Sequence, residues 1–178
     1  VVDGTTVDVE IYDYVKDSKG NHITAEDVVY SYEQAIASGT MEKLNGYLCK
    51  VTATGDYTVR ITLTSASKGA MEWSLTTVPI ISKAWFSAAS DADKTSDPAT
   101  TGAYLLKEFS SGSHTTLELN PDYWQTDESL RSYYDSQYYN TITINVLKES
   151  SMRVIALENG ETDACQNVPA AEISTFLN

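Results

Sequence analysis

The sequence predicts an α/β fold of the mixed α+β kind, with mixed sheets and flanking helices. Strand-like segments alternate apolar and polar residues, as in residues 5–15, where Val7, Val9 and Ile11 alternate with acidic residues. Residues 24–39 instead place apolar residues at helical spacing. Turns containing Gly, Asp and Pro separate these segments, and we find no internal repeat. Together the patterns favour short strands and helices around a packed core.

Composition limits the class of protein. The chain has 178 residues, of which 42% are hydrophobic, enough for one packed domain or two small lobes. Its formal net charge of −13 repels polyanions, so we expect no nucleic-acid partner. No run of apolar residues is long enough to span a membrane. The chain begins at Val1 without Met, signal peptide or lipidation motif, so we expect a piece of a longer or processed protein.

The first helix has the clearest boundaries. Thr24 is the expected N-cap, and the Asp27 carboxylate is placed to accept from the free backbone donors of the first turn. Ser38 and Gly39 are expected to end the helix. Four apolar residues form the stripe that we expect to be buried: Val28, Tyr32, Ala35 and Ile36.

The remaining elements follow from alternation and turn residues. We expect hairpins at residues 49–64 and 101–120, a strand at 141–147, helices at 68–75 and 152–159, and a helical start at 170–177. A weaker helix is expected at 41–48, a crossing segment at 78–82, and a short extended segment at 161–165. Ser150 and Ser151 are the expected cap of the helix that Gly160 ends. We expect a first sub-lobe at residues 1–86, a linker loop at 87–100 and a second sub-lobe at 101–178.

Aromatic residues follow the second hairpin. Asn120-Pro121-Asp122 should end its second strand, and Tyr123 and Trp124 come next. We expect these two rings to seal the hairpin against the core rather than to contact a ligand. The tyrosines between residues 133 and 139 fit a solvated loop, a lobe interface or a ligand edge, and the sequence does not decide among these.

Neither catalysis nor a metal site is expected. His22 and His114 lie in turns without a nucleophile motif beside them, so we expect no enzyme and name no catalytic residue. Cys49 and Cys165 are far apart and lack ligands at metal-binding spacing. Two buried thiols are favoured over a disulfide. We expect no cofactor.

Three blocks of the sequence resemble one family. They are GNHITAEDVVYSYEQA (residues 20–35), TGAYLLKEFSSGSHTTLELNPDYW (101–124) and ALENGETDA (156–164). In this order and spacing they resemble the family 5 extracellular solute-binding proteins, the oligopeptide, dipeptide and nickel receptors of ABC importers. Ala103 stands where the family usually has Pro, and Thr162 where it usually has Ile.

This resemblance implies a fragment of a type II periplasmic-binding-protein-like fold, taken from the first lobe. The whole protein would capture a peptide or similar small solute and deliver it to an ABC permease in the membrane. Its second lobe, which supplies much of the pocket, has no counterpart here. The implied location is extracellular, at the cell surface through a lipid anchor, or periplasmic.

Three residues are candidates for ligand contact. Tyr30 lies about 200° around its helix from Val28 and Tyr32, and the resemblance implies a place at the cleft; a partly exposed helix tyrosine is the equally weighted alternative. Tyr104 and Asp163 are the others, although for Asp163 a structural hydrogen bond to a neighbouring turn is favoured. A different function, a stand-alone carbohydrate-binding or adhesion module using the Tyr-rich segment, also fits the sequence.

Overall fold

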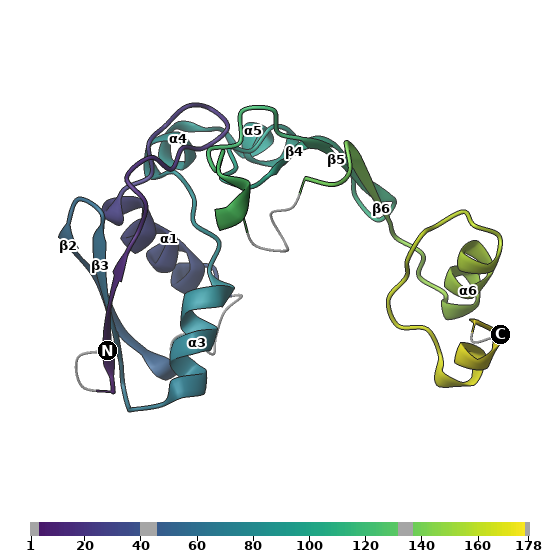
Figure 1. Cartoon of the computed structure of the whole chain (residues 1–178), viewed down its shortest axis with the longest axis horizontal. Helices are drawn as coiled ribbons and strands as arrows, with labels where there is room; N and C mark the ends of the chain where they lie inside the picture. Colours follow the sequence, from purple (N-terminus) through teal and green to yellow (C-terminus); the bar gives the residue numbers. More distant parts are fainter. Residues whose placement is uncertain (1–3, 40–45, 132–136, 177–178) are drawn as a thin grey trace.

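The computed structural model describes residues 4–39, 46–131 and 137–176, apart from the side chains of Cys49 and Thr175. It confirms the α+β fold: two three-stranded sheets, in the orders β1-β3-β2 and β4-β5-β6, lie in different parts of an arched chain (Figure 1). Both are antiparallel throughout the described residues, so the expected mixed sheets are not found there. The elements in order are β1 (Thr6–Glu10), α1 (Ala25–Ala37), β2 (Leu48–Gly55), β3 (Thr58–Leu63), α3 (Lys68–Thr77), α4 (Lys83–Ala88), α5 (Asp91–Ser96), β4 (Tyr104–Ser110), β5 (His114–Leu119), η1 (Glu128–Leu130), β6 (Thr141–Asn145), α6 (Ser150–Glu158) and η3 (Ala170–Phe176).

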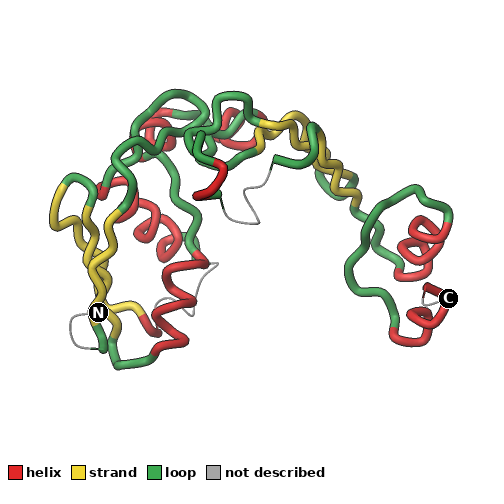
Figure 2. Tube along the Cα trace, viewed as in Figure 1, coloured by secondary structure: helices red, strands yellow, loops and turns green. Residues whose placement is uncertain are grey.

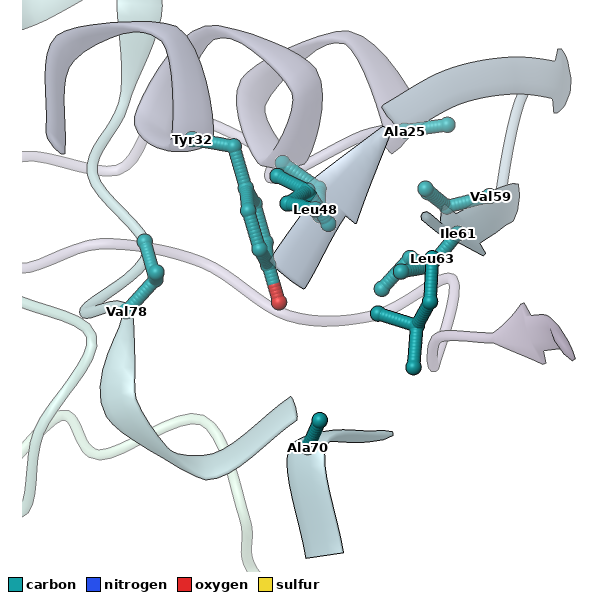
Figure 3. Packing of buried hydrophobic residues seen from close by; sticks show 9 residues of the cluster. Ala25, Tyr32, Leu48, Val59, Ile61, Leu63, Ala70 and Val78 are labelled. Atoms are coloured by element: carbon teal, nitrogen blue, oxygen red, sulfur yellow. The ribbon is translucent and has the colours of Figure 1, made fainter. Parts of the chain in front are cut away.

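The core lies between the first sheet and α1. β3 is the central strand, and its Val59 and Ile61 are only 1% and 2% exposed. The Tyr32 ring points from α1 toward α3 (Figure 3), where its hydroxyl donates to the Ser74 carbonyl oxygen at 2.7 Å. Burial raises the pKa of Tyr32 to about 12, since the charged phenolate is disfavoured away from water. The predicted stripe of α1 is confirmed, with Val28 and Tyr32 buried and Ala35 and Ile36 partly buried against the same cluster.

The Asp27 carboxylate holds the start of α1 to the crossing segment. Its Oδ2 accepts from the backbone N–H of Thr24 at 2.7 Å and from the Thr24 hydroxyl at 2.9 Å. Its Oδ1 accepts from the backbone N–H of Lys83 at 2.7 Å, at the start of α4. Ser31 adds a second hydrogen bond between α1 and the crossing segment, because its Oγ accepts from the Ile81 N–H at 2.9 Å. The predicted cap is therefore present, and the same buried carboxylate also fixes a segment 56 residues away.

The second sheet is less buried than the first. The β4–β5 hairpin turns at Gly112, whose φ of +72° lies in the left-handed region that favours glycine. None of the described residues of β4, β5 or β6 is fully buried. Phe109 and Ile144 are 52% and 53% exposed. The described part of the chain therefore leaves apolar surface of this sheet open to solvent.

The two halves meet through a polar loop. The Ser18 N–H donates to the Thr100 carbonyl oxygen at 2.8 Å, and the Thr100 N–H donates to Ser18 Oγ at 3.2 Å. Lys19 pairs with Asp97 at 2.5 Å. Residues 87–100, predicted as a linker loop with room for a short helix, contain the helix α5 and dock on the turn that precedes α1. The sub-lobe boundaries themselves stay a prediction.

Several elements differ from expectation. Helix α4 was not predicted, and the segment at 161–165 forms bends rather than a strand (Figure 2). Glu149, not the serines, is the N-cap of α6: its carbonyl oxygen accepts from the Arg153 N–H, so the helix already includes Ser150. Cys165 is a free thiol but is half-buried rather than buried. The Cys49 side chain and most of the helix expected at 41–48 lie outside the described residues.

Candidate ligand-binding site

An apolar cleft of about 340 Å³ lies where the first sheet, α1 and the second hairpin meet. Its apolar lining comes from segments far apart in the sequence: Ile11, Val15, Ile23, Val28 and Ile80. The loop between β1 and α1 supplies three of these residues, and the crossing segment that Ser31 fixes supplies Ile80. The hydrogen bonds of Ser18 with Thr100 and of Ser31 with Ile81 fix segments that form the walls of this cleft.

Three aromatic rings gather at this cleft. Tyr12 and Trp124 line it, and Tyr14 stacks on Tyr12 with ring centroids 5.1 Å apart. Trp124 lies 6.2 Å from Tyr12 and 5.9 Å from Tyr14. The indole N–H of Trp124 donates to the Thr101 carbonyl oxygen at 2.8 Å, and the buried Gln125 side chain donates to the Tyr14 hydroxyl at 3.3 Å. These bonds hold Trp124 and Tyr14 in place, and Tyr12 is positioned by stacking on Tyr14.

Tyr12 nevertheless keeps 49% of its surface exposed, and Tyr14 keeps 41%. Aromatic rings held by hydrogen bonds but open to solvent offer large rigid contact area at a small cost in side-chain entropy. Glu10 is the one charged residue of the cleft lining. The arrangement therefore suits apolar or aromatic groups, and disfavours anions.

The cleft lining holds no His, Cys or Ser, and its polar side chains are those of Glu10, Tyr12, Thr101 and Trp124. Elsewhere in the described residues, no group of three or more His, Cys, Asp or Glu side chains is placed to hold a metal ion. Among the described helices, none has the length and apolar character needed to cross a membrane.

The three residues predicted for ligand contact lie in three different places, and none lines the cleft. Tyr30 lines a separate groove and packs edge-on against Phe86, with ring centroids 6.2 Å apart. The Tyr104 hydroxyl donates to the Tyr139 carbonyl oxygen at 2.9 Å. Asp163 is exposed beyond α6, and its carboxylate accepts no hydrogen bond from another described residue, so the expected bond to a turn is not found. A ligand role for each stays a prediction.

Sequence reasoning missed Tyr12 and Tyr14. It placed them in one strand of residues 5–15, whereas β1 ends at Glu10 and both tyrosines lie beyond it. The sequence did contain a signal for them: two tyrosines two positions apart follow the last apolar residue of the alternating pattern. Tyr123 is buried, as predicted, at 6% exposure. Trp124 is half-buried: it packs on Tyr123, donates to Thr101 at the start of the hairpin, and also lines the cleft. It is therefore not a fully buried core residue, and its expected role in sealing the hairpin stays a prediction.

Comparison with known proteins agrees with the fold. The family model described as bacterial extracellular solute-binding proteins, family 5 middle, matches residues 1–178. The chain belongs to this family. It is 26% identical over 174 residues to the nickel-binding protein NikA of Staphylococcus aureus, and 26% identical over 181 residues to the oligopeptide-binding protein AppA of Bacillus subtilis.

Solved family 5 solute-binding proteins share the fold. The structure of AppA from Bacillus subtilis in complex with a nonapeptide matches 98% of this chain with a TM-score of 0.72 and 25% identity. MoaA from A. tumefaciens R10, in complex with mannopinic acid, matches 92% of this chain with a TM-score of 0.70 and 26% identity. The match to NikA includes 98% of this chain but only 33% of NikA, and the match to AppA includes 97% of this chain but only 32% of AppA. It therefore spans about a third of the curated relatives it matches.

Proposed function

We propose that this chain forms part of the receptor subunit of an ABC importer that captures peptides or similar small solutes outside the membrane and delivers them to a permease. One observation carries the proposal beyond family membership: the cleft with Tyr12 and Trp124 on its wall is apolar, aromatic and partly open. A wall of this kind accepts many side chains, because every apolar or aromatic group gains by leaving water there.

The rest of the site would come from the two thirds of the family's length that this chain does not span. A concave site buries most of a ligand's surface, and a cleft of about 340 Å³ holds only part of a peptide. Closure of a second lobe over the first would complete it, as in hinge-bending binding proteins. Attachment to the cell surface through a lipid anchor, or a periplasmic location, is part of the same proposal.

Relatives differ in what they carry. AppA is an oligopeptide-binding protein and NikA a nickel-binding protein, whereas MoaA is seen with mannopinic acid. An apolar cleft lined by aromatic rings, with one carboxylate and no cationic side chain, favours peptides with apolar or aromatic side chains over small anionic solutes.

The test is calorimetric titration of the full-length receptor with a mixture of short peptides. Tyr12→Ala should weaken peptide binding about tenfold, since it removes a ring worth roughly 1–2 kcal/mol of contact. Tyr138→Ala is the matched control, because Tyr138 is 77% exposed and does not line the cleft. Equal affinities for wild-type protein and the Tyr12 variant would refute the assignment of this wall.

The exposed tyrosines support one other candidate, a carbohydrate-binding or adhesion surface. Tyr138 and Tyr139 are 77% and 67% exposed and adjacent, as sugar-stacking residues are. Tyr133 and Tyr134 lie outside the described residues. Titration with oligosaccharides separates the two candidates: this second function requires sugar binding that is lost in the Tyr138→Ala variant and kept in the Tyr12→Ala variant.

A further inference from the structure

The aromatic rings at the apolar cleft have no cation of their own. These rings are Tyr12, Tyr14 and Trp124. Elsewhere the chain places a cation over a ring face: Lys94 Nζ lies 4.3 Å from the Phe86 ring centre, and the Arg131 guanidinium lies 5.8 Å from that of Tyr123. A ring face attracts a cation through its negative electrostatic potential. In the described part of the chain, no Lys or Arg takes this position over the three rings at the cleft.

The lining of the cleft carries one negative charge and no positive one. Five of its nine residues are aliphatic, two are aromatic, and the others are Glu10 and Thr101. Glu10, the last residue of β1, is exposed and forms no ion pair with a described side chain. Arg131 does not line the cleft, because it packs on the buried Tyr123 and donates from Nε to the Gln125 carbonyl oxygen at 2.8 Å. The lining therefore favours a cation over an anion.

The cleft offers few hydrogen-bond acceptors to that cation. A primary ammonium group carries three N–H donors and a guanidinium group carries five, and each donor that leaves water needs an acceptor. The Thr101 carbonyl oxygen already accepts from the Trp124 indole N–H at 2.8 Å. A quaternary ammonium group has no N–H donor, and its methyl groups gain from aliphatic walls as well as from ring faces. The lining therefore favours a quaternary ammonium group over the side chains of Lys and Arg.

The rings are accessible and preorganised for such a group. Tyr12 keeps 49% of its surface exposed and Tyr14 keeps 41%. The hydrogen bonds of Tyr14 with Gln125 and of Trp124 with Thr101 hold the cluster before a ligand arrives, which lowers the entropy lost on binding. The volume of about 340 Å³ lies near the lower end of the roughly 300–1,000 Å³ typical of small-molecule sites, so it suits one head group.

We propose that this cleft binds a quaternary ammonium group, which lies on the exposed faces of Tyr12 and Trp124 and has Glu10 as its counter-charge. The inference rests on the proposed function in one respect only, that this cleft is a wall of the solute site. A choline-like solute and a peptide with a trimethyllysine side chain carry the same group, and separate titrations tell these two sources apart.

The test is calorimetric titration of the full-length receptor with choline and with its neutral carbon analogue, in which a tert-butyl group replaces the trimethylammonium group. The two compounds share shape and apolar surface, so their difference in affinity reports the charge. We expect choline to bind about tenfold more tightly. A second titration compares Ala-trimethyllysine-Ala with Ala-Lys-Ala. A preference of about fivefold for the methylated peptide would identify a peptide as the source, whereas a preference seen with choline alone would identify a free solute.

Matched variants locate the bound group. Tyr12→Leu keeps an apolar side chain but removes the ring, so it should weaken choline binding about fivefold and leave the neutral analogue nearly unchanged. Tyr12→Phe keeps the ring and should keep the choline affinity. Glu10→Gln should weaken choline binding about threefold. Glu72→Gln makes the same change in net charge at an exposed residue of α3 outside the cleft, and it should leave choline binding unchanged.

Two results would overturn the proposal. One is equal affinity for choline and its neutral analogue together with no preference for the methylated peptide. The other is a choline affinity that Tyr12→Leu leaves unchanged, since the cation would then be bound elsewhere. If short peptides still bind and depend on Tyr12 in either case, the proposed function stands and this inference fails. If choline binds as expected and short peptides do not bind, the inference stands and the peptide class of the proposed function fails.

Discussion

Removing the Asp27 carboxylate should destabilise the protein more than any other single change at the start of α1. Asp27 is 6% exposed and accepts three hydrogen bonds, two from Thr24 and one from the Lys83 N–H. Loss of a helix cap costs about 1 kcal/mol. A buried backbone donor that loses a charged partner costs about 2 kcal/mol more. We therefore expect Asp27→Ala to lower the free energy of unfolding by about 3 kcal/mol.

The assay is urea denaturation followed by circular dichroism, with Glu26→Ala as the matched control. Glu26 is the preceding residue of the same helix turn, but its side chain is 74% exposed. Its removal should leave the denaturation midpoint nearly unchanged, since exposed ion pairs contribute little. Asp27→Asn should fall between the two, because an amide keeps one acceptor and loses the other. If Asp27→Ala and Glu26→Ala shifted the midpoint equally, the buried carboxylate would not hold α1 to α4 as described.

Three further predictions follow from the core and the thiol. Ile61→Ala should lower the free energy of unfolding by about 3 kcal/mol in the same assay. Ile155 is 53% exposed, so Ile155→Ala should lower it by well under half of that. Comparable losses in the two variants would place the core elsewhere. Burial raises the pKa of Tyr32 to about 12, whereas the pKa of Tyr in the unfolded chain is near 10. The neutral Tyr32 phenol therefore contributes fully to folding stability below pH 10, and this contribution is lost as the pH rises toward 12. Stability measured between pH 9 and 12 should fall less steeply in Tyr32→Phe than in wild type, and parallel curves would contradict this. Cys165 should react with a thiol reagent in native, unreduced protein, with the label mapped to its peptide; an unreactive Cys165 would indicate a disulfide.

The strands and α1 could be predicted because their signals are local. Alternation along β3 and the Thr24–Asp27 pair depend on residues close in sequence, and each was found where expected. The start of α6 was misplaced by two residues, since a serine favours both the cap and the first turn and only the backbone bond to Glu149 decides.

The cleft could not be predicted because it is assembled from distant segments. Tyr12 and Trp124 are brought together by the hydrogen bonds between Ser18 and Thr100 and by the hydrogen bond from Trp124 to Thr101. A pattern read within a short window of sequence does not reveal such contacts. The resemblance found the family but placed ligand contact at Tyr30, on the other side of α1 from the buried stripe. A helix position gives the direction of a side chain, not what lies opposite it.

The most direct test of the central claim, that the aromatic cleft is a wall of the solute site, is hydroxyl-radical footprinting of the full-length receptor with and without saturating peptide. Tyr12 is 49% exposed, so it is open to oxidation in the free protein. We predict that peptide lowers the oxidation of Tyr12 and Trp124 several-fold and leaves Tyr138 unchanged. Unchanged oxidation of Tyr12 and Trp124 at saturating peptide would show that the ligand lies elsewhere.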